Sequence, residues 1–240
     1  MNGFTHCFIK YTALAITLSA MVILSGTNSA QAQLLPMLNT YLEQRASEFD
    51  QIPPERREKL DAVAREIQTR IAARRPVNLI FICTHNSRRS HFGQVWGAAA
   101  AAYFGLPRIS TYSGGTEETA CNPRTINAFR RAGFSIDVPK PASNPVYTVH
   151  YSSSFPPAAC FSKIYNSPVN PQKNFIAVMT CSDADEKCPI VIGATARFPI
   201  TYEDPKRSDG TPEEAATYDE TCRLIAREWC YVMSRAKNGS

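Results

Sequence analysis

The feature that most constrains this chain is an apolar run at residues 77–82, which leads directly into a loop that begins at Cys83 and reaches Arg89. Five of the six residues in the run are Val, Leu, Ile or Phe, as expected of a strand covered on both faces. The Ala-rich segment 90–104 after the loop is predicted to be a helix. A buried strand that turns through a short loop into a helix is typical of parallel α/β sheets, whose binding sites lie at the carboxyl ends of the strands.

The remainder of the chain alternates in the same way, and we expect an α/β fold with a parallel four-stranded sheet flanked by helices. Further strands are predicted at 109–113, 174–180 and 196–200, and helices at 122–132 and from Thr211 onward. In the last helix, Thr211 is predicted to cap the N-terminus, with Glu214 positioned for a capping box. Its inward stripe is predicted to consist of Tyr218, Cys222, Ile225, Trp229 and Met233.

Two segments are added to this pattern, so we divide the chain into a signal (1–32), an N-terminal helical extension (33–75) and a catalytic domain (76–240). The extension contains two helical stretches separated by Pro53 and Pro54. They are interpreted as helices packed on the domain, with a partner-binding arm as the alternative. Residues 141–172 are rich in Pro, Ser and Asn, and are interpreted as an inserted hairpin with strands at 146–151 and 161–165.

The first 32 residues have the pattern of a cleavable secretory signal. Lys10 precedes an apolar run that ends near Leu24, and small residues follow as far as Ala32. A membrane anchor is the alternative, but the run is shorter than the roughly 20 residues that span a bilayer. We therefore expect cleavage near Ala32, no stable membrane anchor, and a periplasmic or secreted protein.

Charge and cysteine content narrow the partners. The formal charge of +5 falls to +4 when Lys10 leaves with the signal, which weakly favours a small anionic substrate and is too low for a nucleic-acid-binding protein. Loss of Cys7 leaves an odd number of cysteines within predicted strands and helices, and a domain of this size does not need a disulfide framework. We expect no metal site and no tightly bound cofactor.

The loop after the first strand has the composition of an oxyanion-binding nucleophile. A loop that opens into a helix points backbone N–H groups at one spot, where the helix dipole adds positive charge and favours the thiolate form of Cys83. Arg89 can hold two oxygens of a tetrahedral anion with its planar guanidinium. The residues expected to surround that anion are Thr84, His85, Asn86, Ser87, Arg88 and Ser90. A structural cysteine in an ordinary turn is the alternative.

Together, these residues resemble the signature of the low-molecular-weight protein tyrosine phosphatase superfamily, which includes the thioredoxin-linked arsenate reductases. The resemblance runs from Val77 to the C-terminus without the inserted hairpin, and segments 112–117, 122–123 and 203–205 occur in the family's order. It implies that Asp204 is the general acid that protonates a leaving oxygen. Without the resemblance, Asp204 and Pro205 would be read as a turn.

A second motif, from Cys181 to Cys188, directly follows the predicted strand at 174–180. Similarity to the reductase branch implies that Cys83 forms an arsenate adduct, Cys181 attacks Cys83 and Cys188 resolves Cys181. The resulting disulfide would await an external thioredoxin-like dithiol. A static disulfide or a metal-binding pair is the alternative for this motif.

Four positions depart from the family pattern. Arg88 stands where the reductase branch commonly has a further cysteine, and Lys206 stands where phosphatases often carry an aromatic side chain for phosphotyrosine. Gln94 stands where some members have a Glu that helps to bind potassium, and His85 replaces a small, Gly-like residue. Three functions therefore remain open at this point: an arsenate reductase, a phosphomonoesterase that uses Cys83, Arg89 and Asp204, and a non-catalytic oxyanion- or partner-binding module.

Overall fold

The computed structural model describes residues 1, 3, 34–106 and 108–238. Apart from Met1 and Gly3, the segment interpreted as a signal lies outside these residues. Within the described part of the chain, no helix combines the length and apolar character needed to cross a membrane.

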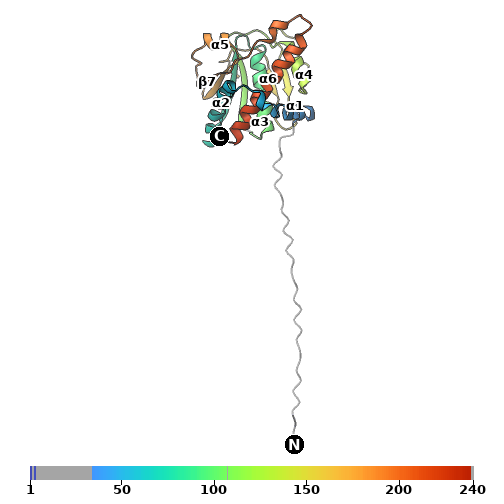
Figure 1. Ribbon diagram of the computed structural model, residues 1–240, viewed down its shortest axis with the longest axis vertical. Helices are drawn as coiled ribbons and strands as arrows, with labels where there is room; N and C mark the ends of the chain where they lie inside the picture. The colour runs from blue at the N-terminus through green and yellow to red at the C-terminus, as the bar shows by residue number, and fades with distance from the viewer. Residues whose placement is uncertain (2, 4–33, 107, 239–240) are drawn as a thin grey trace. The chain divides into compact units, whose positions relative to one another are not determined.

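The centre of the fold is a parallel sheet with the strand order β2-β1-β6-β7 (Figure 1). Its strands are β1 (Val77–Cys83), β2 (Ile109–Gly115), β6 (Phe175–Met179) and β7 (Ala194–Pro199). The predicted α/β class with a four-stranded parallel sheet is therefore confirmed. Cys83 pairs with Gly115, and Ile82 pairs with Met179, so the carboxyl ends of three neighbouring strands lie level with one another.

The two faces of the sheet are covered differently. Leu79 and Phe81 on β1 belong to the main hydrophobic core, which they share with most of the helices. Ile80 and Ile82 point to a smaller core on the other face, where the short helix α5 (Ser182–Lys187) packs. The longer helices are α1 (Pro36–Ala46), α2 (Pro54–Ala72), α3 (Arg89–Tyr103), α4 (Pro123–Ala132) and α6 (Glu214–Asn238).

Local sequence sets the ends of α4. The Asn122 side chain accepts a hydrogen bond from the Arg124 N–H at 2.9 Å, and Pro123 follows in the first turn, where it needs no hydrogen-bond partner. Gly133 ends the helix in the left-handed conformation, with a φ of 106°.

The start of α6 differs from the prediction. The helix begins at Glu214, and Thr211 does not cap it: the Thr211 hydroxyl donates to the carbonyl of Ser208 at 2.9 Å. The Glu214 carboxylate instead accepts from the Gly210 N–H at 2.7 Å. The capping-box prediction is wrong because the short 3-10 turn η2 (Pro205–Ser208) already uses the threonine hydroxyl. The predicted inward stripe of the helix is confirmed, because all five of its residues are buried.

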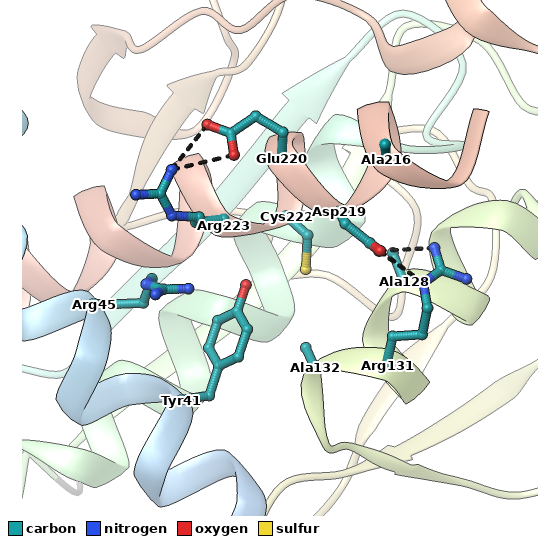
Figure 2. A pocket seen from close by; sticks show the side chains of 10 residues that line it. All are labelled: Tyr41, Arg45, Ala128, Arg131, Ala132, Ala216, Asp219, Glu220, Cys222 and Arg223. Carbon is teal, nitrogen blue, oxygen red and sulfur yellow. Dashed lines mark hydrogen bonds and ion pairs between the residues drawn. The ribbon is translucent and has the colours of Figure 1, made fainter. Parts of the chain in front are cut away.

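The N-terminal extension packs against the catalytic domain. Helices α1 and α2 bury Leu38, Leu42, Leu60 and Ile67 in the main core, and the turn η1 (Phe49–Gln51) lies between them without a buried residue. A cavity of about 400 Å³ remains between α1, α4 and α6 (Figure 2). Tyr41 forms one wall of it and stacks on Trp96 of α3, with ring centroids 5.0 Å apart.

The inserted segment forms a hairpin with a different second strand from the one predicted. Strand β4 (Tyr147–His150) pairs in antiparallel fashion with β5 (Ala158–Cys160) and with β3 (Ser135–Ile136). The predicted strand at 161–165 is wrong, because that segment leaves the hairpin and bridges to β2 of the main sheet through Ile164 and Gly115. Gly114 permits this approach, since a Cβ at that position would lie 2.3 Å from the Tyr165 Cα.

Candidate active site

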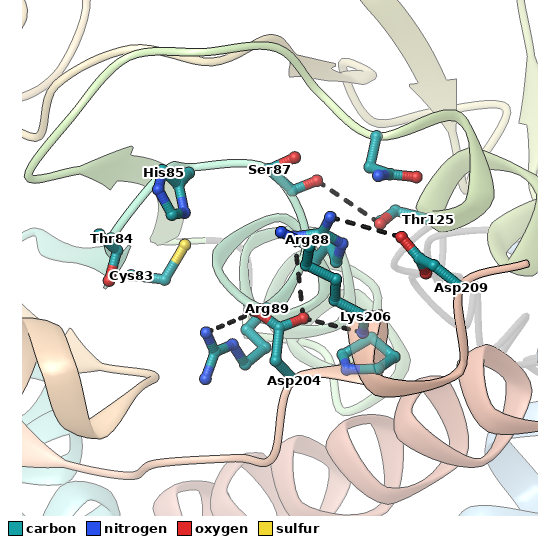
Figure 3. A network of polar contacts seen from close by, with 12 residues as sticks. Cys83, Thr84, His85, Ser87, Arg88, Arg89, Thr125, Asp204, Lys206 and Asp209 are labelled. Carbon is teal, nitrogen blue, oxygen red and sulfur yellow. Dashed lines mark hydrogen bonds and ion pairs between the residues drawn. The ribbon is translucent and has the colours of Figure 1, made fainter.

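The loop between β1 and α3 holds the Cys83 sulfur at its centre (Figure 3). The Cys83 Sγ lies 3.1 Å from the Ser90 hydroxyl oxygen. That hydroxyl also accepts a hydrogen bond from the Asn86 side-chain amide at 2.8 Å. Asn86 is fully buried and adopts a positive φ of 45°, a conformation that asparagine tolerates better than most residues. These bonds fix the loop around the sulfur.

The carbonyl groups of the loop point outward, and neighbouring segments donate hydrogen bonds to them. The N–H groups of Thr116 and Glu117 donate to the carbonyls of Cys83 and Thr84 at 3.1 and 2.9 Å. The Ser162 hydroxyl donates to the His85 carbonyl at 2.8 Å. Within the described residues, the backbone N–H groups of positions 84–88 donate no hydrogen bond to the protein. These N–H groups are therefore available to donate to an anion, and the predicted anion-binding role of the loop stays a prediction.

Arg89 and Asp204 lie together at this site. Arg89 donates to an Asp204 carboxylate oxygen at 2.7 Å and to the Tyr202 carbonyl at 3.0 Å. The Arg89 Nε is buried and has no partner among the described residues. The Asp204 carboxylate also accepts from the Lys206 N–H at 3.1 Å. A buried guanidinium N–H without a protein partner could donate to an anion, and the anion-binding role of Arg89 stays a prediction.

Arg88 does not occupy the loop interior. Its Nε donates to the Tyr218 hydroxyl at 2.9 Å, and its terminal nitrogens lie 3.8 Å from Asp204 and Asp209. The side chain is therefore held by α6 and by the segment that carries Asp204 (Figure 3). The expected contribution of Arg88 to anion binding stays a prediction.

Residue His85 lies at the rim of the loop. Its side chain is 48% exposed and its Nε2 lies 3.4 Å from Glu117. Thr84 and Ser87 are buried, and the Thr84 hydroxyl lies 3.5 Å from the Cys181 sulfur.

The three cysteines of the expected relay share one cluster on the same face of the sheet. Cys83, Cys181 and the half-buried Cys188 belong to the smaller core, together with Ala184 of α5. The Cys181 sulfur accepts a hydrogen bond from the Ala184 N–H at 3.4 Å, and Cys188 ends the same helix. All three cysteines are free thiols.

The other described cysteines are unsuited to be nucleophiles. Burial raises the pKa of Cys160 and Cys222 to about 12, and it raises the pKa of Cys121 and Cys230 as well. The Cys222 sulfur accepts a hydrogen bond from the Trp96 indole N–H at 3.2 Å, in agreement with its predicted place in the core. These four thiols stay protonated at neutral pH.

The sequence did not predict that His91 and Lys163 lie near the loop, nor that the Tyr218 hydroxyl accepts a hydrogen bond from Arg88. His91 follows the loop on α3, and Lys163 contacts the loop from the inserted segment. Lys163 gave no signal, because a lysine in a segment rich in Pro, Ser and Asn is normally exposed. Among the described residues, no group of three or more His, Cys, Asp or Glu side chains is arranged to hold a metal ion.

These features define an α/β protein with a parallel sheet, in which the first strand leads into a loop that carries a cysteine and an arginine. No protein-family model matches the chain. Several curated proteins, however, are similar to the chain in sequence. An arsenate reductase from Bacillus subtilis (strain 168) is 28% identical over 145 residues, which cover 60% of this chain and 86% of the relative. "Arsenate reductase 2" of Staphylococcus epidermidis (strain ATCC 35984) is 28% identical over 127 residues, or 53% and 77% of the two chains.

Solved structures of the same group are more distant. A low-molecular-weight protein tyrosine phosphatase from T. tengcongensis gives a TM-score of 0.45 at 12% identity, covering 66% of this chain and 99% of that one. An arsenate reductase in the phosphate binding state gives 0.41 at 12% identity, covering 67% and 97%. The curated sequence relatives are thus arsenate reductases, and the solved structures that this chain is similar to include a low-molecular-weight protein tyrosine phosphatase and an arsenate reductase.

Proposed function

We propose that the protein reduces arsenate to arsenite through a relay of Cys83, Cys181 and Cys188. The observation that carries this proposal is the shared cluster of these three thiols at the carboxyl edge of the sheet, beside a loop with free N–H donors. A phosphatase has no chemical need for the second and third cysteines. The names of the sequence relatives support the same activity.

The cysteine thiols supply the two electrons that reduce arsenate to arsenite. The Cys83 thiolate attacks arsenic(V) and forms an S–As bond, and an oxygen leaves as water. The Cys181 thiolate then attacks the Cys83 sulfur, the electrons of the S–As bond pass to arsenic, and arsenite leaves. Cys188 displaces Cys83 from the disulfide, which restores the Cys83 thiolate. The remaining Cys181–Cys188 disulfide takes two electrons from an external dithiol. Arg89 and the loop N–H groups hold the oxyanion during the first two steps.

The position of Cys181 favours the first disulfide, because its sulfur lies 3.5 Å from the hydroxyl of Thr84, the residue after Cys83. The second disulfide, between Cys181 and Cys188, needs a large rearrangement. A residue pair separated by seven helical steps is about 10 Å apart along the axis, whereas disulfides join Cα atoms about 4.4–6.8 Å apart. Cys181 and Cys188 flank the six-residue helix α5. The relay therefore requires α5 to unwind when this disulfide forms.

The reductant and compartment are part of the proposal. The composition of residues 1–32 supports export to the periplasm or beyond, where the electron donor would be a thioredoxin-like dithiol protein of that compartment. Half-buried Cys188 is the sulfur such a donor reaches first.

The alternative is a phosphomonoesterase with Cys83 as nucleophile, Arg89 as anion clamp and Asp204 as general acid. Its specific support is the position of Asp204, whose carboxylate lies 2.7 Å from Arg89. In this reaction the Cys83 sulfur takes the phosphoryl group and Asp204 protonates the departing alcohol.

One experiment separates the two. Thiol-driven arsenate reduction and aryl phosphate hydrolysis are measured side by side on the wild type, Cys181→Ser and Cys83→Ser, with Cys230→Ala as a control for loss of a buried thiol outside the cluster. We expect Cys181→Ser to lose arsenate turnover at least 100-fold while Cys230→Ala keeps it. Arsenate turnover that survives Cys181→Ser would rule out the relay, and strong ester hydrolysis in that variant would favour the phosphatase.

A further inference from the structure

A lysine is buried behind the oxyanion loop. Lys163 is only 5% exposed, and it lies on the segment that leaves the inserted hairpin for β2. Its ammonium lies 3.3 Å from the Phe161 carbonyl, 3.4 Å from the Ser113 hydroxyl and 4.3 Å from the centroid of the Phe161 ring. Each of these contacts stabilises a cation, but none carries a negative charge.

No carboxylate balances this ammonium among the described residues. The titratable groups that face it are His91 on α3, Cys121 on the loop before α4 and Cys160 on β5. The two thiols are protonated at neutral pH because burial raises their pKa, and burial, followed by the Lys163 charge itself, lowers the pKa of His91 to about 3. The ammonium is thus surrounded by neutral groups. An unpaired buried charge is costly, and such charges concentrate at functional sites.

Main-chain contacts fix Lys163 against the catalytic loop. Its N–H donates to the Asn86 side-chain oxygen at 3.0 Å, and its carbonyl accepts from the Gly115 N–H at 2.8 Å. The Asn86 amide donates in turn to the Ser90 hydroxyl, which lies 3.1 Å from the Cys83 sulfur. A chain of hydrogen bonds therefore connects Lys163 with the nucleophile through the loop itself.

We infer that Lys163 is a positioning residue whose ammonium supplies a fixed positive charge behind the oxyanion loop, and whose backbone holds Asn86 in the conformation that shapes the loop. The inference rests on the proposed function, since it concerns how the same site holds its oxyanion. An anion bound in the loop would balance the charge of the Lys163 ammonium. The ammonium therefore strengthens anion binding, and the bound anion stabilises the charged form of Lys163.

The charge has a limited pH range. Burial lowers the pKa of Lys163 to about 8, so the ammonium is present at neutral pH and is lost as the pH rises above that value. Anion binding should weaken over the same range. An arginine at this position would stay charged, and the adjoining cavity of about 220 Å³, which Lys163 lines, leaves space for a guanidinium.

The test is protection of Cys83 by inorganic phosphate against alkylation with iodoacetamide, quantified by peptide mass spectrometry from pH 6.5 to 9.5. It compares the wild type, Lys163→Arg and Lys163→Met, with Lys173→Met as a control for an exposed lysine. Ionisation of phosphate is common to all four proteins, and the alkylation rate of each protein without phosphate at the same pH is its own reference, so differences in protection belong to the substituted residue.

We expect phosphate protection to weaken above pH 8 in the wild type and in Lys173→Met more than in Lys163→Arg. Lys163→Met should need about tenfold more phosphate at pH 7, the size expected for one nearby unit charge, and should show no step near pH 8. Protection by Lys163→Met that equals the wild type at pH 7 would overturn the inference. If Lys163→Met does not fold, identical pH profiles of the wild type and Lys163→Arg would overturn it equally.

The readout does not depend on turnover. If the wild type reduces no arsenate yet shows this protection pattern, the proposed function fails and the role of Lys163 in anion binding stands. If arsenate is reduced but the pattern is missing, only the inference about Lys163 fails.

Discussion

At the scale of single residues, His91 shows how the site excludes charge that it does not need. The ring is fully buried on α3, and its Nδ1 lies 3.2 Å from the Ser113 hydroxyl. Burial, and secondarily the charge of Lys163, lowers its pKa to about 3. The imidazole is therefore neutral throughout the physiological range and leaves Lys163 as the cation of this cluster.

This lowered pKa makes stability dependent on acid. In the unfolded chain, His91 binds a proton below about pH 6.5, whereas in the folded chain it does so only below about pH 3. The contribution of His91 to the free energy of unfolding is therefore fully present above about pH 6.5 and decreases as the pH falls. We expect the wild type to lose up to about 1.4 kcal/mol per pH unit more than His91→Gln in that window. Urea unfolding at pH 7, 5.5 and 4.5 measures this; parallel losses in both proteins would contradict it.

The sequence alone predicted the positions of Cys83 and Arg89 on a loop between a strand and a helix, but not the residues that surround them. Cys83 and Arg89 follow from a buried strand, a loop and a helix, which are local patterns. Lys163 and Tyr218 reach the loop from segments about 80 and 130 residues away. Such contacts depend on tertiary packing, for which one sequence provides no periodic signal.

At the scale of elements, the same distinction holds. Strands β1 and β6 and helix α4 were predictable because apolar runs and capping residues determine them locally. Strand β5 was missed because the alternating residues 161–165 serve a bridge to β2 rather than the hairpin. The start of α6 was missed because the Thr211 hydroxyl belongs to the preceding turn.

Helix α5 is the element whose structure the proposed relay must change. Formation of the Cys181–Cys188 disulfide should unwind it, because helical geometry keeps the two sulfurs too far apart. We expect amide hydrogen exchange of residues 183–187 to become at least tenfold faster after oxidation with arsenate, while β6 is unchanged. Cys188→Ser, treated in the same way, is the matched control and should keep the slow exchange. Equal protection of α5 in reduced and oxidised wild type would argue against this disulfide.

At the scale of the whole molecule, the N-terminal extension is connected to the catalytic site. Arg56 of α2 donates two hydrogen bonds of 2.8 Å to Glu228 of α6, and its guanidinium lies 4.9 Å from the centroid of the Tyr202 ring. The carbonyl of Tyr202 accepts from Arg89. The extension thus supports the segment that positions the guanidinium of the site, in addition to enlarging the core.

The molecule as a whole is proposed to pass two electrons from Cys188 at its surface to an oxyanion above Cys83. Disulfide mapping by mass spectrometry after one turnover with arsenate, without added reductant, tests this most directly. The account predicts a Cys181–Cys188 disulfide in the wild type and a trapped Cys83–Cys181 disulfide in Cys188→Ser. Arsenite release with all three thiols still reduced, or a disulfide that leaves out Cys83 in the trapped variant, would contradict it.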